Sequence, residues 1–216
     1  MNVMRPMMIC LFLLLLAGTA GAESHHGYYA GAWYGISAFE TSTANDDLGS
    51  FNLEADQDSF WGISFGYDLP SQSTGANGRV EIEYGHRSNS FDNGQFNNGA
   101  FAASGDVQVE SLLLNSFAVF PNQTRVSPYL GLGLGGAKLT IDNLQIDGQP
   151  FIDDECLVFA WQLGGGLEIE LTRSLRVDLG YRYFSVYQPE LNEVDGRKVK
   201  PDYTAHSGML GVVWMF

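Results

Sequence analysis

Hydrophobic and polar residues alternate with a period of two in eight separate segments of the chain. A period of two predicts β-strands, because successive side chains of a strand point to opposite faces. The segments comprise residues 27–39, 58–69, 79–88, 107–120, 128–141, 157–171, 174–186 and 204–216. Each is long enough to cross a bilayer as a tilted strand, which takes about 9 to 11 residues.

The connections between these segments alternate in length. Those after the second, fourth and sixth segments are short, whereas those after the first, third, fifth and seventh are long and polar. Long extracellular loops and short periplasmic turns are typical of outer-membrane barrels. We therefore expect an all-β fold, a closed antiparallel eight-stranded transmembrane β-barrel, with both termini on the periplasmic side.

The two faces of the predicted strands differ in charge. In segment 174–186 the apolar face carries Leu175, Val177 and Leu179, and the opposite face carries Arg176 and Asp178. A soluble barrel has an apolar interior, whereas a barrel in lipid turns its apolar face outward and its polar face inward. The pattern therefore predicts a charged lumen.

The inward charges form the main candidate site. By the parity of their segments we expect eight residues to make a lumen charge network: Arg79, Glu81, Glu83, Glu168, Glu170, Arg176, Asp178 and Arg182. Glu168 and Glu170 also fit an acid and base pair, but pairing between arginines and carboxylates satisfies buried charges that are otherwise costly. Gly131, Gly133 and Gly135 alternate with leucines and would leave room for the long side chains.

Two segments leave their register open. Segment 27–39 has no decisive charged face. In segment 107–120, Gln108 and Glu110 fit one parity and Asn115 fits the other. The strand therefore needs either a bulge or a polar residue near the membrane surface.

The N-terminus has the features of a secretory signal peptide. Arg5 supplies a positive region, residues 7–16 are apolar, and Ala20-Gly21-Ala22 fits a cleavage site. We expect residues 1–22 to be the signal and residues 23–216 to form one outer-membrane β-barrel domain. No second run of 18 or more apolar residues predicts a helical membrane span.

The chain is acidic, with 11 basic and 25 acidic residues and a net charge of -14. This balance excludes nucleic acid as a partner. Cys156 is the one cysteine left after the predicted cleavage, so no internal disulfide is possible. Many acids fall in the predicted loops, where they are either solvated or in contact with lipopolysaccharide and loosely held divalent cations.

The C-terminal segment places Val212, Trp214 and Phe216 on one alternate face. A terminal phenylalanine on an outward apolar face resembles the insertion signal of bacterial outer-membrane barrels. We expect these three residues to be an assembly signal that the barrel assembly machinery recognises.

Across residues 23–216 the chain resembles the opacity-protein and OmpA-like family of eight-stranded outer-membrane β-barrels. The resemblance is carried by short stretches in order: 29–32, Gly66-Tyr67, 80–84, 115–120, 128–133, 163–167, 180–183 and Phe216. It implies architecture more than function, because barrels of this kind include adhesins and envelope-stabilising proteins. We expect no peptidoglycan-binding domain after Phe216, in contrast to the two-domain members of that family.

Two local patterns suggest chemistry. His86-Arg87-Ser88-Asn89 is similar to the His-x-Ser-Asn stretch of lipid A deacylases, but no acid stands at Ala100, where that family has one. Glu23-Ser24-His25 would begin the processed chain and fits a site for Cu²⁺ or Ni²⁺ of low specificity. We expect neither to be functional, and we expect no resident metal or cofactor.

These features predict a monomeric, non-enzymatic barrel of the Gram-negative envelope. Its acidic loops would serve adhesion, partner binding or envelope integrity, with outer-membrane lipid, lipopolysaccharide or a host surface as the partner. A small porin-like diffusion channel is the main alternative, and a lipid A deacylase-like enzyme is a distant one. Eight strands enclose an interior that side chains nearly fill, which favours the first function.

Overall fold

The computed structural model describes residues 27–39, 42–46, 49–55, 58–69, 75–96, 99–146, 148–192 and 198–216. The expected signal peptide, residues 1–22, and the domain boundary before Glu23 lie outside these ranges. In the described part of the chain no helix is long and apolar enough to cross a membrane.

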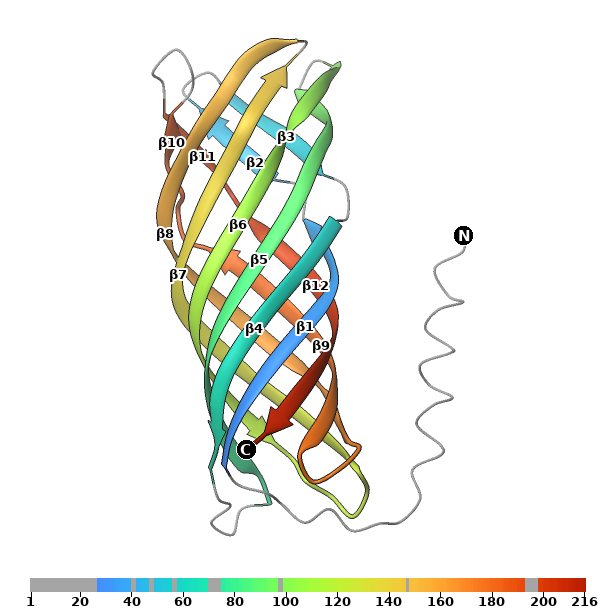
Figure 1. Ribbon diagram of the computed structural model, residues 1–216. Helices are drawn as coiled ribbons and strands as arrows, with labels where there is room; N and C mark the ends of the chain where they lie inside the picture. Colours follow the sequence, from blue (N-terminus) through green and yellow to red (C-terminus); the bar gives the residue numbers. More distant parts are fainter. Residues whose placement is uncertain are drawn as a thin grey trace, which may run out of the picture.

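Eight antiparallel strands close into a barrel (Figure 1). In spatial order these are β1 (Gly27–Phe39), β4 (Asp58–Asp68), β5 (Asn77–Phe96), β6 (Gly99–Val119), β7 (Val126–Ile146), β8 (Gln149–Glu170), β9 (Leu175–Val186) and β12 (Thr204–Met215). β12 pairs with β1, so the last strand closes the barrel on the first. The predicted fold class is confirmed, and each barrel strand corresponds to one predicted segment.

Strands β5 to β8 extend beyond the predicted segments at one end of the barrel. The barrel end at which the C-terminus lies is called the terminal end here, and the opposite end the far end (Figure 1). Four further strands lie at the far end: β2 (Ser42–Asp46), β3 (Gly49–Ala55), β10 (Leu191–Asn192) and β11 (Lys198–Pro201). β5 pairs with β6, and β7 with β8, far beyond the predicted segment ends. The long connections predicted after segments three and five are therefore largely extended hairpins rather than loops.

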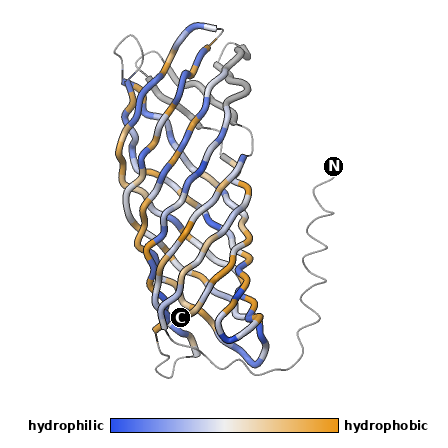
Figure 2. Tube along the Cα trace, viewed as in Figure 1, coloured by the Kyte–Doolittle hydropathy of each residue, from blue (hydrophilic) through white to orange (hydrophobic). Residues whose placement is uncertain are grey.

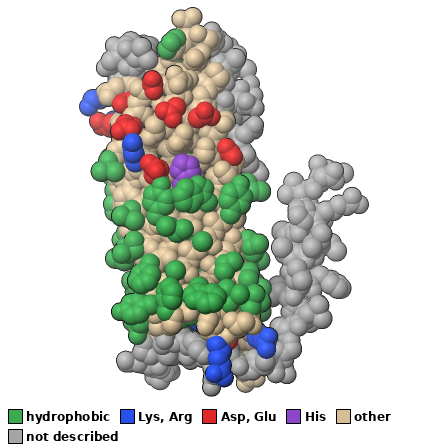
Figure 3. Space-filling model, in the orientation of Figure 1, with side chains coloured by type: hydrophobic (Ala, Val, Ile, Leu, Met, Phe, Trp, Pro, Cys, Tyr) green, Lys and Arg blue, Asp and Glu red, His purple; other side chains and the backbone are tan. Residues whose placement is uncertain are grey.

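The outward side chains of these long strands change from apolar at the terminal end to polar at the far end. Toward the terminal end, Leu114, Leu132 and Leu163 face outward and are about half exposed. Toward the far end, the outward positions of the same strands carry Asp106, Lys138, Glu155 and other polar residues. Figure 3 shows the result, a belt of hydrophobic side chains with acidic side chains beyond it. The strands thus combine a membrane-type barrel with a far-end extension that has a polar exterior.

The far-end extension, formed by the far halves of β5 to β8 with β2, β3, β10 and β11, contains an apolar core. Its inward residues include Val109, Leu139, Leu144, Ile152 and Leu191, all at most 2% exposed. Asn192 on β10 donates its backbone N–H to a carboxylate oxygen of Asp154 on β8 at 2.7 Å, which ties β10 to the wall. The alternation of apolar and polar residues along the wall strands is visible in Figure 2.

The change of the outward face from apolar to polar along β6 settles the register of segment 107–120, which the sequence left undecided. Glu110 faces outward beyond the belt, while Asn115 faces the lumen, so both belong to one uninterrupted register of β6. The shift in the β6–β7 register lies instead between Ser104 and Asp106, where Gly105 adopts a φ of 153°. A Cβ at Gly105 would lie 2.7 Å from the Leu144 Cα, so only glycine fits this bulge.

The predicted assembly residues lie on the outer face of β12. Val212, Trp214 and Phe216 are exposed, and the Phe216 backbone N–H donates to the Tyr28 carbonyl at 3.0 Å. The last residue therefore helps to close the β1–β12 seam and also presents an aromatic side chain outward.

We expect deletion of Phe216 to reduce the fraction of chain that assembles in the outer membrane. The deletion removes both the seam hydrogen bond and the terminal aromatic ring. The measurement is the ratio of heat-modifiable folded band to unfolded band in membrane fractions. Leu210→Ala, an outward change on the same strand and away from the seam end, is the control. Equal assembly of the deletion and the unmodified protein would contradict an assembly role for Phe216.

Candidate functional site in the barrel lumen

The inward face of β5 organises the lumen. Arg79, Glu81, Glu83 and Arg87 follow one another at every second position except for Gly85, and all four are buried. A strand directs alternate side chains to one face, so this single strand places two acids and two arginines along the barrel axis. Their contacts come from β1, β4, β6, β8 and β9.

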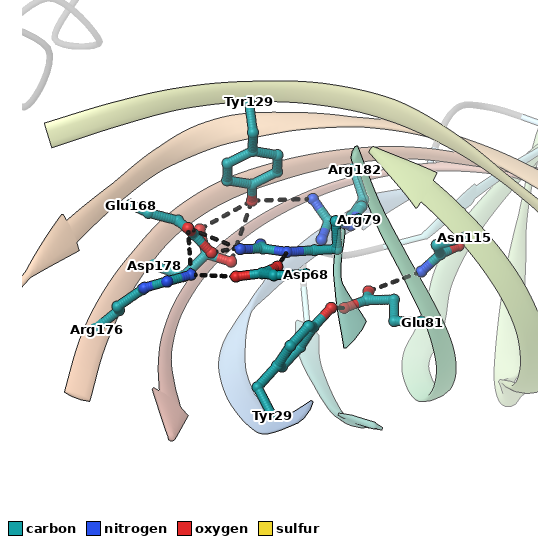
Figure 4. Close-up of polar contacts among 10 residues, drawn as sticks. All are labelled: Tyr29, Asp68, Arg79, Glu81, Asn115, Tyr129, Glu168, Arg176, Asp178 and Arg182. Atoms are coloured by element: carbon teal, nitrogen blue, oxygen red, sulfur yellow. Dashed lines mark hydrogen bonds and ion pairs between the residues drawn. The ribbon is translucent and has the colours of Figure 1, made fainter. Parts of the chain in front are cut away.

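Arg79 is the centre of a cluster near the terminal end (Figure 4). Its Nη1 and Nη2 both donate to the Glu168 carboxylate on β8, the Nη2 bond at 2.9 Å, and its Nε donates to Asp68 on β4 at 2.7 Å. Arg176 on β9 donates to the other oxygen of Asp68 at 2.8 Å and lies 3.5 Å from Glu168. Two arginines and two carboxylates therefore neutralise one another across four strands.

Further along β5, a second cluster holds the two glutamates. The Tyr29 hydroxyl on β1 donates to Glu81, and the Asn115 amide on β6 donates to Glu81 at 3.0 Å and to Glu83 at 2.7 Å. Gln162 on β8 donates to Glu83 at 3.1 Å and to the Asn115 side-chain oxygen at 3.0 Å. Amides and a phenol, rather than arginines, are the main donors to these carboxylates.

Arg182 on β9 lies beside the second cluster. Its Nη1 donates to the Tyr129 hydroxyl on β7 at 3.2 Å, and that hydroxyl donates to Asp178 at 2.8 Å. The guanidinium also lies over the Phe117 ring, 5.0 Å from the centroid, and its Nε is 3.8 Å from Glu83. The cation is therefore held by an aromatic face and a hydroxyl as much as by charge.

Two lumen glycines make room for these side chains. A Cβ at Gly133 would lie 1.9 Å from the Asn115 Oδ1, and one at Gly164 would lie 2.9 Å from the Arg182 Cδ. Either side chain would displace a member of the network. The glycine and leucine alternation in β7 is thus a packing requirement of the lumen.

The structure brings seven of the eight predicted lumen residues to the interior. Glu170 is different: it is half-buried at the terminal end of β8 and makes no ion pair with any described residue. Arg176, directly across the β8–β9 ladder, reaches inward to Asp68 and Glu168.

Five members of the network were not among the eight residues predicted for it: Tyr29, Asp68, Asn115, Tyr129 and Gln162. The alternation had already placed Gln162 on the inward face of its segment. Asp68 and Tyr129 share the inward parity of Gly66 and Gly131, so the parity rule itself identifies them. Tyr29 lies in the segment whose register was left open, and no sequence signal joins it to Glu81.

His86 and Ser88 lie on the outer face of β5, as their parity predicts. Glu110 stands directly across from His86 in the β5–β6 ladder, so an acid is present near the motif although none is at the expected position. Its carboxylate accepts a hydrogen bond from Tyr84 at 2.7 Å, and the His86 ring stacks near Trp61 at 5.4 Å. Among the described residues no hydrogen bond joins His86 to Ser88 or Glu110, so the motif does not form a triad here.

The outer wall of the far-end extension carries acids from three neighbouring strands. Lys138 on β7 pairs with Glu155 on β8 at 2.6 Å, and Gln108 on β6 donates to Asp142 on β7 at 3.3 Å. The set, called the acidic wall here, comprises Asp106, Glu110, Asp142, Asp153 and Glu155. In the described ranges no three His, Cys, Asp or Glu side chains are grouped closely enough to hold a metal ion. The Glu23-Ser24-His25 site lies outside those ranges.

A separate ion cluster lies beside β8 at the far end. Lys200 and Lys198 on β11 contact Glu190 at 2.6 Å and 3.2 Å, and these hydrogen bonds hold the pKa of Glu190 below its usual range. All three side chains are largely exposed, so the cluster contributes little to stability.

Comparison with known proteins gives a family and a fold. The family model described as "Outer membrane protein beta-barrel domain" matches residues 8–216. A Brucella abortus (strain 2308) protein, named only as uncharacterized, is 32% identical over 91 residues, which are 37% of this chain and 31% of that protein. The chain therefore aligns with about a third of the length of this curated relative.

Two solved structures share the fold at low sequence identity. Neisserial surface protein A matches 90% of this chain and 100% of its own, with a TM-score of 0.54 and 20% identity. The outer membrane protein OprG from Pseudomonas aeruginosa matches 89% of this chain and 99% of its own, with a TM-score of 0.57 and 15% identity. At these identities the likeness concerns the barrel architecture alone.

Proposed function

Since the chain belongs to the family of outer membrane proteins with a β-barrel domain, we propose that it is a non-enzymatic barrel of the Gram-negative outer membrane that associates with lipopolysaccharide through its acidic wall. The terminal end is periplasmic in this proposal and the far end is at the cell surface. The short turns between β6 and β7 and between β8 and β9 support that orientation, because short turns of outer-membrane barrels face the periplasm.

The observation that carries the proposal is the inversion of hydrophobicity in β5 to β8. The acidic wall begins where the hydrophobic belt ends, at the depth where lipid headgroups meet the barrel (Figure 3). Because the wall strands are hydrogen-bonded and backed by an apolar core, the carboxylates are held on a firm surface. Divalent cations bridge carboxylates to lipopolysaccharide phosphates, since both ligands supply hard oxygens.

The same contacts argue against two other functions. Charged and aromatic side chains fill the lumen, which disfavours a diffusion channel. His86 lacks hydrogen bonds to Ser88 and Glu110 in the described chain, which disfavours deacylation. The far end is also compatible with adhesion to a host surface. No feature of the acidic wall favours a host surface over lipopolysaccharide as its partner.

The test compares lipopolysaccharide retention by purified protein in the presence of Mg²⁺. We expect substitution of the acidic wall (Asp106→Asn, Glu110→Gln, Asp142→Asn and Glu155→Gln together) to lower co-purifying lipopolysaccharide severalfold, and chelation of Mg²⁺ to have the same effect on the unmodified protein. Mass spectrometry measures the amount and also reports whether the lipid A acyl chains are intact.

Glu190→Gln with Asp202→Asn is the matched control, because it removes two exposed far-end acids that are not part of the acidic wall. Equal retention by the wall variant and the control would show that the acidic wall is not the lipid contact. Loss of an acyl chain that depends on His86 would replace the proposal with an enzymatic one.

A further inference from the structure

Gly208 on β12 leaves a bare patch of backbone on the outer face of the barrel. It is exposed, and a Cβ there would lie within 4 Å of no atom of the described residues. Gly208 is paired with Tyr181 on β9 and with Ile36 on β1, and both side chains are about half exposed or more on the same face. The backbone at Gly208 therefore lies at the bottom of a hollow, called the Gly208 notch here, which is bounded by Ile36, Tyr181, His206 and Leu210.

The far side of the notch is polar. The hydroxyl of Tyr181 is hydrogen-bonded to Nδ1 of His206, the next outward residue of β12 beyond Gly208. The Tyr181 ring therefore leans along the barrel toward His206 and does not cover the Cβ position at Gly208. The ring centroid of Tyr183 lies 5.1 Å from that of His206, and the ring centroid of Trp161 on β8 lies 5.5 Å from that of Tyr183. Such aromatic side chains are typical of the depth at which bilayer hydrocarbon meets the headgroups.

The outward face of β12 changes from apolar to polar at this depth. Its outward residues on the terminal side of the notch are at least half exposed: Leu210, Val212 and Trp214. Thr204 follows His206 on the far side. The notch therefore opens on lipid in an outer-membrane barrel, with its apolar part at acyl-chain depth. Neighbouring strands lie about 4.8 Å apart, so Tyr181 and Ile36 stand about 10 Å apart, which leaves room for one extended acyl chain.

The hydrogen-bonded pair of Tyr181 and His206 favours a chain that carries a hydroxyl group. A phenol hydroxyl both donates and accepts. If Tyr181 donates to His206, its oxygen accepts from a ligand; if His206 donates, the Tyr181 hydroxyl donates to the ligand. A hydroxyl on the chain fits either case, whereas an ester carbonyl only accepts and fits only the second. Acyl chains of lipid A carry 3-hydroxyl groups near their carbonyl ends, and those of ordinary glycerophospholipids do not.

We propose that the Gly208 notch binds one 3-hydroxyacyl chain of lipid A, with the chain along Gly208 and its hydroxyl on the Tyr181–His206 pair. This inference rests on the proposed function for its orientation, with the far end at the cell surface, and it adds a contact to the lipid portion of lipopolysaccharide. The notch is formed by β9, β12 and β1, whereas the acidic wall is formed by β6, β7 and β8. The notch contact uses no carboxylate and needs no divalent cation.

The test is native mass spectrometry of the folded protein with added lipid A, in EDTA so that no cation bridges form at the acidic wall. We expect Gly208→Leu, which fills the notch, to weaken lipid A binding about fivefold, the size expected for loss of one hydrogen-bonded contact in an apolar medium. Tyr181→Phe keeps the ring and removes only the hydroxyl. It should weaken lipid A binding to a similar extent and leave binding of phosphatidylethanolamine unchanged.

Gly136→Leu is the matched control, because it fills an outward glycine position on β7, where the nearest atom to a Cβ is 3.8 Å away. It should bind lipid A as the unmodified protein does, and so should the acidic-wall variant in EDTA, which separates failure of the notch from failure of the wall. The Gly208 amide signal in NMR should shift when lipid A is added. Equal binding by Gly208→Leu and Gly136→Leu, an equal loss of both lipids in Tyr181→Phe, or an unshifted Gly208 signal would overturn the proposal.

Discussion

Replacing Arg79 with methionine is expected to lower the free energy of unfolding by about 3 to 5 kcal/mol, the usual cost of removing one partner from a buried ion pair. Arg79 makes three hydrogen bonds to Asp68 and Glu168, and all three side chains are nearly inaccessible to solvent. Methionine retains much of the aliphatic volume but leaves two carboxylates with only Arg176 as a cation. Denaturant titration of the protein in lipid vesicles, followed by tryptophan fluorescence, measures the change.

Two further variants separate charge from packing. Adding Asp68→Asn and Glu168→Gln to Arg79→Met should recover part of the loss, because the neutral amides no longer require a cation. Lys138→Met removes the exposed pair with Glu155 and should change the free energy by less than about 1 kcal/mol. If Arg79→Met were as mild as Lys138→Met, the terminal-end cluster would not be a stabilising element of the barrel.

The membrane half of the fold was predictable because its side chains obey one simple rule. Alternation identified all eight strands, and charge on one face identified which residues lie inside. That rule predicts the face of the barrel toward which each side chain points, but it does not predict the residue with which the side chain pairs. Glu81 binds Tyr29 and Asn115 instead of an arginine, since those groups come from β1 and β6, whose registers the pattern did not determine.

The far-end extension was not predicted because its alternation has the opposite sign. Asp142, Asp153 and Glu155 were interpreted as loop acids, yet they are outward residues of β7 and β8. Ile141, Leu144 and Ile152, which lie next to or between them in the sequence, are inward residues of the same strands. A polar exterior over an apolar interior is the pattern of a soluble sheet. The rule for a membrane barrel, with apolar side chains outward and polar side chains inward, therefore misassigned the far-end extension.

The contacts of Arg87 were not predicted for a related reason. Its parity with Arg79, Glu81 and Glu83 predicts an inward side chain, which the structure confirms, but it was not included in the predicted charge network. Its partners, Phe60 and Phe184, are aromatic residues that the apolar-outward rule assigns to lipid, whereas both are 0% exposed inside the barrel. The rule that apolar side chains face outward therefore fails wherever the lumen itself becomes apolar.

The interior contacts predict that the unmodified protein conducts poorly. In planar bilayers we expect only rare, small openings, because Arg79, Arg182 and their partners are buried against one another across the lumen. Replacing Arg176 and Arg182 with alanine should raise the opening frequency, since it removes the two cations that β9 sends into the lumen. The apolar core of the extension stays packed in this variant, so the openings should become more frequent rather than large.

Arg125→Ala with Arg173→Ala is the control, because it also removes two arginines but from exposed turns at the terminal end. It should leave the recording unchanged, which would separate loss of lumen packing from loss of positive charge. Large, stable single-channel steps in the unmodified protein would contradict the filled lumen and favour a diffusion channel. If the Arg176→Ala, Arg182→Ala variant showed no increase in openings, the barrier to ion flow would instead lie at Arg87 and the apolar core. Both are outside the network to which these two arginines belong.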